Sequence, residues 1–291
     1  MENLKRHSIQ AFYTLLTNSY FKGFFSGEIY QGQLKSYCVP GLNCYSCPGA
    51  RFACPIGSLQ AVIGARNFKF SFYVIGFLAL IGGLIGRFVC GFLCPFGFFQ
   101  DLIHKIPFPK KIRTFKFDKI LRFLKYIVLL VFVILMPLFL VDVLGQGAPY
   151  FCKLICPAGT FEAGIPLVLK NEGLRATVGF LYAWKMVILV ITLLVAIMIY
   201  RPFCKYLCPL GAIYSLFNPI SLYRYSVNEH KCISCGKCKK VCKMNVDPTI
   251  NPNDGECIRC GLCKNACPTS AIESGFIQKE AEEDLAVSRG I

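Results

Sequence analysis

The most conspicuous pattern in the chain is a series of long apolar runs separated by short polar segments. Residues 126–145 and 180–200 form two runs of about 20 residues, the length that an α-helix needs to cross a bilayer. Residues 70–89 form a third run, whose glycines and alanines would let helices approach each other closely in lipid. Residues 9–25 form a weaker run that polar residues interrupt, so this segment either crosses the membrane or lies at its surface. The pattern predicts three or four transmembrane helices.

The distribution of positive charge predicts how these helices are oriented. Eight lysines and arginines lie between residues 105 and 125, opposed only by Asp118. Because short loops rich in lysine and arginine stay in the cytoplasm, this segment is predicted to be cytoplasmic. Residues 146–177 carry three cations and two glutamates, so they are expected outside. The same alternation places residues 27–68 outside and everything after Arg201 in the cytoplasm.

Composition supports a membrane protein and excludes several other classes. Hydrophobic residues make up 55% of the chain and charged residues 16%, with a mean hydropathy of +0.51. These values exclude a disordered chain and argue against nucleic acid as the partner of the +16 net charge, which suits a cytoplasmic membrane face. None of the three histidines lies in a long apolar run, so a transmembrane haem pathway is excluded. The eighteen cysteines are too many for structural thiols alone.

Eight of these cysteines follow the spacing of bacterial ferredoxins near the C-terminus. The pattern C-x2-C-x2-C-x3-C occurs twice, starting at Cys232 and at Cys257. In such ferredoxins the fourth cysteine of each run binds the other cluster. Zinc also accepts C-x2-C pairs, but it does not need two interleaved quartets. We therefore assign one 4Fe–4S cluster to Cys232, Cys235, Cys238 and Cys267, and the other to Cys257, Cys260, Cys263 and Cys242.

A second cysteine pattern, C-x3-C-P-x-G, occurs three times beside apolar runs, starting at Cys90, Cys152 and Cys204. A partial copy ends at Cys54, which is also followed by Pro-x-Gly. Residues i and i+4 of a helical turn share a face, so each pair offers two thiolates in one direction. The proline and glycine then break the backbone, which predicts re-entrant segments buried within protein.

The predicted topology divides the remaining ten cysteines between the two sides of the membrane. Two complete pairs fall on the cytoplasmic side and supply the four thiolates of one cluster. Six cysteines fall outside, and we favour the four at repeat-like positions as ligands of a further cluster. Buried free cysteines and a thiol–disulfide relay are alternatives, and outside the cell disulfides are a third. The inner set is Cys90, Cys94, Cys204 and Cys208, the outer set is Cys47, Cys54, Cys152 and Cys156, and Cys38 and Cys44 are unassigned.

Taken together, these motifs resemble the membrane polyferredoxins of the NapH and NosR kind. The resemblance rests on residues 37–50, on Cys54-Pro-Ile-Gly-Ser-Leu-Gln, on the C-x3-C-P repeats and on the double ferredoxin motif. It implies an integral-membrane iron–sulfur protein that passes electrons between a cytoplasmic or quinone pool and a partner. The long flavin-binding domain that precedes the first cysteines in the NosR kind has no counterpart here, so any flavin is expected on a partner.

We therefore expect a mainly α, multi-pass protein of the cell membrane with a small cytoplasmic α+β ferredoxin-like domain. The domains are predicted at residues 1–227 (transmembrane), 228–270 (ferredoxin-like) and 271–291 (acidic tail). Two 4Fe–4S clusters and one or two further iron–sulfur clusters in the membrane domain are expected, with no catalytic side chain.

The predicted function is electron transfer between a cytoplasmic donor or quinone pool and a partner redox complex, as a subunit of an oxidoreductase. The expected partners are the membrane, a cytoplasmic ferredoxin or flavoprotein, a reductase or flavin-carrying subunit, and a quinone. The alternatives are an accessory reductase for maturation of a respiratory metalloenzyme and a quinol dehydrogenase subunit.

Overall fold

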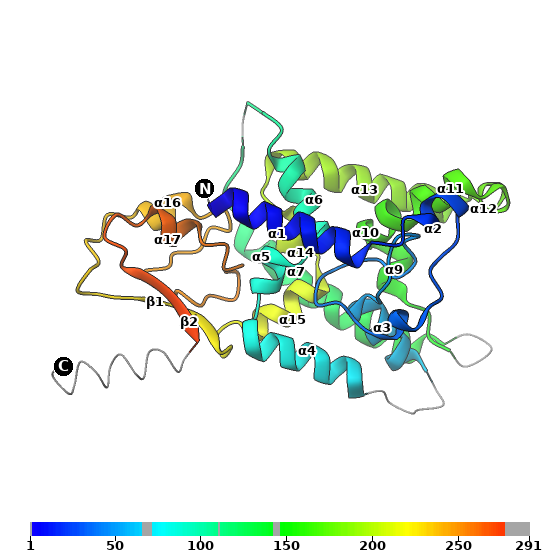
Figure 1. Ribbon diagram of the computed structural model, residues 1–291, viewed down its shortest axis with the longest axis horizontal. Coiled ribbons are helices and arrows are strands. Elements are labelled where there is room, and N and C mark those ends of the chain that lie inside the picture. Colours follow the sequence, from blue (N-terminus) through cyan, green and yellow to red (C-terminus); the bar gives the residue numbers. More distant parts are fainter. Residues whose placement is uncertain (1, 66–71, 110, 142–145, 277–291) are drawn as a thin grey trace.

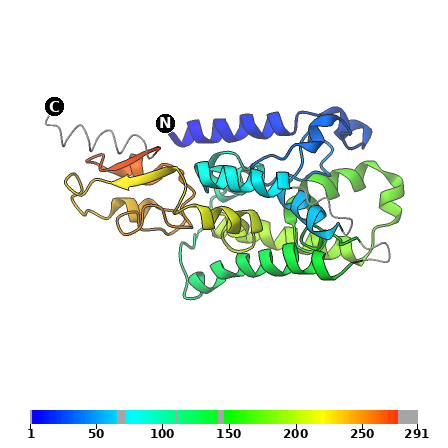
Figure 2. The same cartoon turned by 90° about the horizontal axis from the view of Figure 1, so that it is seen from below.

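A computed structural model describes residues 2–65, 72–109, 111–141 and 146–276 of the chain. The described part is mostly helical and elongated, as expected for a mainly α protein. Helices α1 (Glu2–Thr17), α4 (Phe72–Ile85) and α13 (Phe180–Met198) run along the long axis (Figure 1). The two strands and helices α16 (Lys237–Val241) and α17 (Leu262–Ala266) lie at one end, next to the start of α1, in both views (Figure 1 and Figure 2).

Within the described ranges, two helical segments are long and apolar enough to cross a membrane. One is α13, and the other is the continuous helix formed by α7 (Asp118–Val128), η2 (Leu129–Leu135) and α8 (Met136–Phe139). Most of their apolar side chains face outward rather than into a core, as in helices that contact lipid. The second helix begins at Asp118, earlier than the predicted residue 126, because its charged first turns are paired within the protein. Segment η2 is a π-helix that ends just before Pro137, where the missing N–H disturbs regular helical bonding.

The two weaker runs form helices with different bounds from those predicted. Helix α4 ends at Ile85, directly before Gly86, whose φ of 52° is a left-handed conformation that ends helices. The predicted helix over residues 70–89 therefore ends four residues early, and α5 (Phe88–Phe92) is a separate helix; residues 70 and 71 lie outside the described residues. Helix α1 ends at Thr17 and α2 (Lys22–Ser26) follows after a break, so residues 9–25 do not form one helix.

Each Cys-Pro step ends one short helix and starts another, as the sequence predicts. The steps join α5 to α6 (Pro95–His104), α9 (Tyr150–Leu154) to α10 (Pro157–Gly159), and α14 (Pro202–Tyr206) to α15 (Pro209–Phe217). In each case the cysteine caps the new helix, and its Sγ accepts a hydrogen bond from the glycine N–H three residues later at 3.3–3.5 Å. The partial copy also starts a helix, α3 (Pro55–Gly64), but no helix precedes it and the Cys54 side chain makes no cap hydrogen bond. The remaining helices are η1 (Gln33–Ser36), η3 (Thr160–Gly164), α11 (Ile165–Lys170) and α12 (Glu172–Ala176).

The C-terminal unit is α+β, as expected for a ferredoxin-like fold. Strand β1 (Tyr223–Val227) pairs antiparallel with β2 (Ile272–Phe276), and Tyr225 lies opposite Ser274. Strand β1 therefore precedes the predicted 228–270 domain, and β2 occupies the start of the predicted acidic tail. Residues 277–291 of that tail lie outside the described residues.

Candidate iron–sulfur sites

The ferredoxin quartet that starts at Cys232 lines a single cavity of about 230 Å³. Gly236 lies beside this cavity with a φ of 66°, a conformation that glycine adopts without strain. Cys267 reaches the cavity from the far end of the motif, and its Sγ accepts a hydrogen bond from the Ala271 N–H at 3.3 Å. The structure thus brings together all four predicted ligands of this site, which are Cys232, Cys235, Cys238 and Cys267.

The other ferredoxin quartet, which starts at Cys257, is more enclosed. Cys242 faces Cys260, and Cys257 faces Cys242, Cys260 and Cys263. Burial raises the pKa of the Cys257 and Cys263 thiols to about 12. Thiolates in such a place require positive charge from bound iron, because metal binding drives their deprotonation. The donor set therefore fits a 4Fe–4S cluster, which these four cysteines would hold.

The two inner C-x3-C-P pairs also converge. Cys208 lies within electrostatic range of Cys204, Cys90 and Cys94, and all four side chains are at most 6% exposed. The rings of Phe96 on α6 and Phe203 on α14 meet edge to face, with centroids 5.3 Å apart, and hold the two pairs against each other. The predicted inner set is thus a compact quartet of buried thiols.

Two buried arginines hold the backbone of this inner quartet. Arg201 donates to the Cys90 carbonyl, and Arg87 donates to the Cys204 carbonyl at 3.2 Å. Both guanidinium groups are fully buried, and each also binds a carboxylate, Asp101 for Arg201 and Glu256 for Arg87. Four thiolates around a cluster carry excess negative charge, which these cations offset.

Glu256 connects this quartet to the ferredoxin unit. It binds both Arg87, at 2.8 Å, and Lys125 of α7. Burial alone would raise the pKa of Glu256, but these two cations lower it to about 2. The sequence did not indicate a role for Glu256, and it placed Lys125 only in a cytoplasmic loop. Nothing in the local pattern indicates ion pairs between residues so far apart in the chain.

A glutamine positions one cysteine of the inner quartet. Gln100 Nε2 donates to Cys204 Sγ at 3.1 Å, and its Oε1 accepts from the Phe203 N–H at 3.2 Å. The outer region repeats this arrangement: Gln60 Nε2 donates to Cys152 Sγ at 3.3 Å, and its Oε1 accepts from the Phe151 N–H at 3.0 Å. The repeated contacts indicate two equivalent sites.

Both glutamines occupy the sixth position after a Cys-Pro cysteine. The signal that could have found them is therefore the longer motif C-P-x-G-x-x-Q, which starts at Cys54 and at Cys94. The other two copies place Glu162 and Tyr214 at this position. Glu162 accepts a hydrogen bond from the Cys44 N–H at 2.6 Å, and Tyr214 donates to the Pro40 carbonyl at 2.9 Å. These two side chains fasten the 38–54 segment to the two sites.

In the outer region the structure gathers a different quartet from the predicted one. A cavity of about 380 Å³ is lined by Cys44, Cys54, Cys152 and Cys156. The predicted ligand Cys47 is buried nearby, where its charged neighbours are Glu162 and Lys35. The chain before Cys54 is not helical, and Ala50 stands where a C-x3-C pair would have its first cysteine. A loop cysteine therefore takes the fourth place in the cavity. Cys38 lies apart from it, with Sγ 3.6 Å from the Ser58 hydroxyl.

The arrangement of the thiols bears on disulfides and zinc sites, the alternatives to iron–sulfur clusters. All eighteen cysteines lie in the described ranges, and all are free thiols rather than disulfides. Among the described residues, no three cysteine, histidine or acidic side chains come close enough to hold a single metal ion. A zinc ion needs thiolates at about 2.3 Å from one centre. A cubane binds each thiolate to a different iron, so four thiols that converge from different elements suit a cluster.

Backbone contacts connect successive quartets. An added Cβ at Gly91, between Cys90 and Cys94, would lie 2.3 Å from the carbonyl oxygen of Ile258, which follows Cys257. An added Cβ at Gly41 would lie 2.3 Å from the Leu93 carbonyl oxygen. The neighbouring Leu42 lines the outer cavity, so the 38–54 segment touches both membrane-domain sites. The glycines permit these close approaches.

Comparisons with known proteins agree with these sites. Two models, each described as a 4Fe-4S binding domain, match the chain. One matches residues 51–73, 71–116 and 182–222, and the other matches residues 250–273. These ranges include Cys54, both inner C-x3-C-P pairs and the second ferredoxin run.

Several curated proteins are also similar. The putative electron transport protein YccM of Escherichia coli is 25% identical over 204 residues, which are 67% of this chain and 51% of YccM. The regulatory protein NosR of Stutzerimonas stutzeri is 28% identical over 173 residues, 57% of this chain and 21% of NosR. The methylamine utilization ferredoxin-type protein MauN of Paracoccus denitrificans is 30% identical over 171 residues, 58% of this chain and 52% of MauN. No solved structure matches significantly.

These matches show that the chain contains 4Fe-4S binding domains of the kind found in iron–sulfur proteins. The chain is similar to the membrane polyferredoxins of the NapH and NosR kind, which confirms the resemblance predicted from its motifs. The matches span between 51% and 62% of the length of most of these relatives, and 21% of NosR.

Proposed function

We propose that the chain carries electrons across the membrane through four 4Fe–4S clusters that follow its long axis. A bilayer core of about 30 Å is too wide for one efficient tunnelling step, so intermediate cofactors are needed. The proposed clusters are bound by Cys232, Cys235, Cys238 and Cys267; by Cys242, Cys257, Cys260 and Cys263; by Cys90, Cys94, Cys204 and Cys208; and by Cys44, Cys54, Cys152 and Cys156.

The observation that carries this proposal is the close backbone contact between residues that neighbour ligands of successive quartets. The carbonyl of Ile258, beside one ferredoxin ligand, abuts Gly91 between two ligands of the inner quartet. Gly41 then abuts Leu93, the residue before Cys94, on the side of the outer cavity. Electron tunnelling rates fall exponentially with distance, so such contacts favour transfer from quartet to quartet. Bound iron would supply the redox chemistry, and the chain would hold and space the clusters.

The membrane placement follows the two long apolar helices. We propose that α7–α8 and α13 cross the bilayer and that α1 and α4 pack beside them. Helix α1 exposes Phe12 and Leu15 by 69% and 57%, which suits contact with lipid. The positive segment around α7 and the ferredoxin unit would then share the cytoplasm.

Orientation can be tested with reporter fusions. A reporter fused after Arg113 and another fused after Ile291 should both be active in the cytoplasm, because Arg113 lies in the positive segment and Ile291 follows the last span. A fusion at Glu162 should report the outside. Opposite locations for the Arg113 and Ile291 reporters would contradict two crossings between them.

The ferredoxin site that starts at Cys232 is the proposed point of electron exchange with a soluble redox protein. Cys235 is exposed there, and Ile233 beside it is 63% exposed. Lys237, Lys239 and Lys240 are exposed on the adjacent helix α16. A positive rim around an apolar contact would attract an acidic ferredoxin or flavoprotein and orient it. A partner reductase or flavin-carrying subunit would exchange electrons at the outer cavity.

A liposome experiment tests the proposed function. The full chain is reconstituted anaerobically with iron and sulfide, inserted into liposomes that contain cytochrome c, and given a reduced soluble ferredoxin outside. We expect reduction of the trapped cytochrome c in those vesicles where the ferredoxin unit faces outward. Equal reduction in protein-free liposomes would contradict transmembrane transfer by the chain.

The outer site gives a matched pair of variants. Cys44→Ala should lower the iron content by about four per chain, because Cys44 lines the cavity with the other three thiols. Cys47→Ala removes a cysteine from the same loop, yet it should leave the iron content unchanged. Iron and sulfide analysis of both variants decides between them. Loss of iron in Cys47→Ala alone would restore the ligand set predicted from the sequence.

A further inference from the structure

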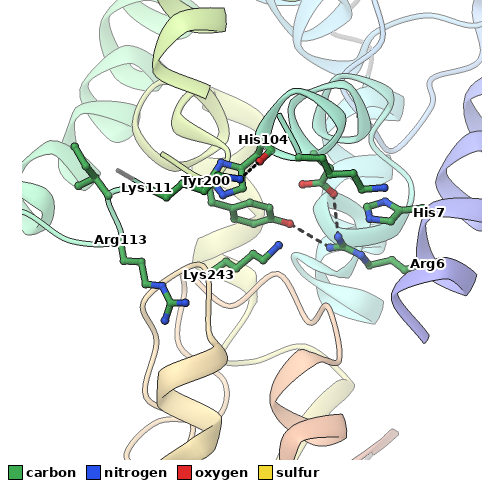
Figure 3. A pocket seen from close by; sticks show the side chains of 10 residues that line it. Arg6, His7, His104, Lys111, Arg113, Tyr200 and Lys243 are labelled. Atoms are coloured by element: carbon green, nitrogen blue, oxygen red, sulfur yellow. Dashed lines mark hydrogen bonds and ion pairs between the residues drawn. The ribbon is translucent and has the colours of Figure 1, made fainter. Parts of the chain in front are cut away.

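A strongly positive pocket lies between the membrane domain and the ferredoxin unit (Figure 3). Its volume is about 330 Å³. Five cationic side chains and two histidines line it, against a single carboxylate. They come from α1, from α6 and the segment that follows it, and from the turn after Cys242. The cationic and imidazole residues are Arg6, His7, His104, Lys105, Lys111, Arg113 and Lys243.

The carboxylate of the pocket, Asp101, is already neutralised. Arg201 Nε and Nη2 bind its two oxygens at 2.7 and 2.5 Å, and Arg6 Nη2 binds it at 3.1 Å. Gln10 donates a further hydrogen bond at 3.4 Å. The remaining cations that line the pocket therefore have no acidic counterpart among the residues that line it.

Arg6 and Lys243 approach the pocket from its two sides. Arg6 is 3% exposed, and its Nη1 donates to the Tyr200 hydroxyl at 3.2 Å, while its buried Nε has no partner. Lys243 Nζ lies 5.1 Å from the centre of the Tyr200 ring. Figure 3 shows the Lys243 ammonium and the Arg6 guanidinium on either side of the Tyr200 hydroxyl. An anion with several oxygens at this point would contact both the Lys243 ammonium and the Arg6 guanidinium.

The histidines report the same electrostatic environment. Burial and then the charges of Arg6 and Lys105 lower the pKa of His7. Burial also lowers the pKa of His104, and Lys111 and Lys243 add to the effect. Burial disfavours a charge of either sign, so only the contribution of the neighbouring cations indicates a preference for an anion.

The lining selects the class of anion. An apolar quinone ring would find only Ile112 and the Tyr200 ring among the lining residues. A phosphate group has several oxygens and carries one negative charge as a diester and up to two as a monoester, which suits arginine and lysine donors from different directions. The apolar side chains of Ile106 and Phe108, exposed by 48% and 42%, lie in the segment beside the pocket. Basic pockets next to apolar surfaces at the cytoplasmic face bind headgroups of anionic lipids.

We propose that this pocket binds a phosphate group, of the kind carried by the headgroup of an anionic membrane lipid. The ligand would tie Arg6 of the membrane domain to Lys243 of the ferredoxin unit, and it would steady the contact between these two parts. The proposal does not depend on the presence of iron in any cysteine quartet.

Binding to the full chain in a neutral detergent tests the proposal. Short-chain phosphatidylglycerol, short-chain phosphatidylcholine and inorganic phosphate are titrated separately by calorimetry. Lys243→Gln should weaken binding of phosphatidylglycerol at least tenfold. Lys231→Gln removes the same charge from an exposed site on the same unit and should change it less than twofold. Lys111→Gln, at another exposed position, serves as a second pocket variant should Lys243→Gln not fold.

The ligands separate the possible sources of the phosphate. Binding of phosphatidylglycerol alone supports a lipid headgroup, and comparable binding of inorganic phosphate supports a soluble phosphate compound. Both results uphold a phosphate site when the pocket variants weaken them. Equal binding of phosphatidylcholine, equal losses in Lys243→Gln and Lys231→Gln, or no binding of either anion would overturn the proposal.

Discussion

Replacing Cys94 with alanine is expected to remove about four irons per chain and to stop electron flow across the membrane. Cys94 is 6% exposed and lies among Cys90, Cys204 and Cys208, so three thiols would have to hold a cluster built on four. Loss of this cluster would interrupt the proposed series of four clusters between the ferredoxin unit and the outer cavity. The ferredoxin clusters should remain reducible by dithionite, because none of their ligands is changed.

Cys38→Ala is the control for this experiment. Cys38 is also buried, at 8% exposed, but its thiol lies beside the Ser58 hydroxyl and does not line the outer cavity. Its loss should leave both iron content and electron flow intact. If Cys94→Ala kept its full iron content and its activity, the C-x3-C-P repeats would be structural and a partner subunit would have to carry the electrons.

The second large effect is expected from Gly91→Ala, which adds one methyl group between two quartets. The added Cβ would lie 2.3 Å from the backbone carbonyl oxygen of Ile258, so the ferredoxin loop must move away. We expect the rate of transfer from the ferredoxin clusters to the inner cluster to fall at least tenfold. The iron content should not change, because no ligand is lost.

Gly76→Ala provides the matched control on helix α4, where an added Cβ meets nothing within 4 Å. Time-resolved absorption after rapid reduction of the ferredoxin clusters would measure both variants. An unchanged transfer rate in Gly91→Ala, with the full iron content, would show that electrons do not pass between the quartets at this contact.

Local spacing explains what the sequence could predict. In the ferredoxin unit, cysteines three or four positions apart set each motif, and the structure brings together both predicted quartets. In the inner membrane site, the i and i+4 spacing and the Pro-x-Gly break are again local, and the pairs starting at Cys90 and Cys204 converge. The i and i+4 pattern can be interpreted from the sequence because helix geometry alone decides that the two thiols share a face.

At the outer cavity the structure places Cys44 beside the other three thiols instead of Cys47, and this fourth thiol comes from a loop. The position of Cys44 depends on the hydrogen bond between its N–H and Glu162, which is far away in sequence. Cys47 stands closer to Cys54 and so fitted the repeat better. A loop without helical periodicity gives no rule for which cysteine faces a cavity.

The buried charges were also beyond a local pattern. Lys125 looked like a member of a positive loop, yet it binds Glu256, and Asp118 binds Lys205 as well as Arg122 one turn away. These pairs allow α7 to extend to Asp118 instead of starting at residue 126. Long-range pairing of this kind overrides the local preference for solvent.

The count of iron and sulfide in the full chain, purified or reconstituted anaerobically, tests the central claim most directly. Four 4Fe–4S clusters predict about sixteen irons and about sixteen sulfides per chain, with electron paramagnetic resonance signals of reduced cubanes in both the ferredoxin and the membrane sites. About eight irons, lost altogether when the eight ferredoxin cysteines are replaced, would contradict the account, because the membrane quartets would then hold no cluster.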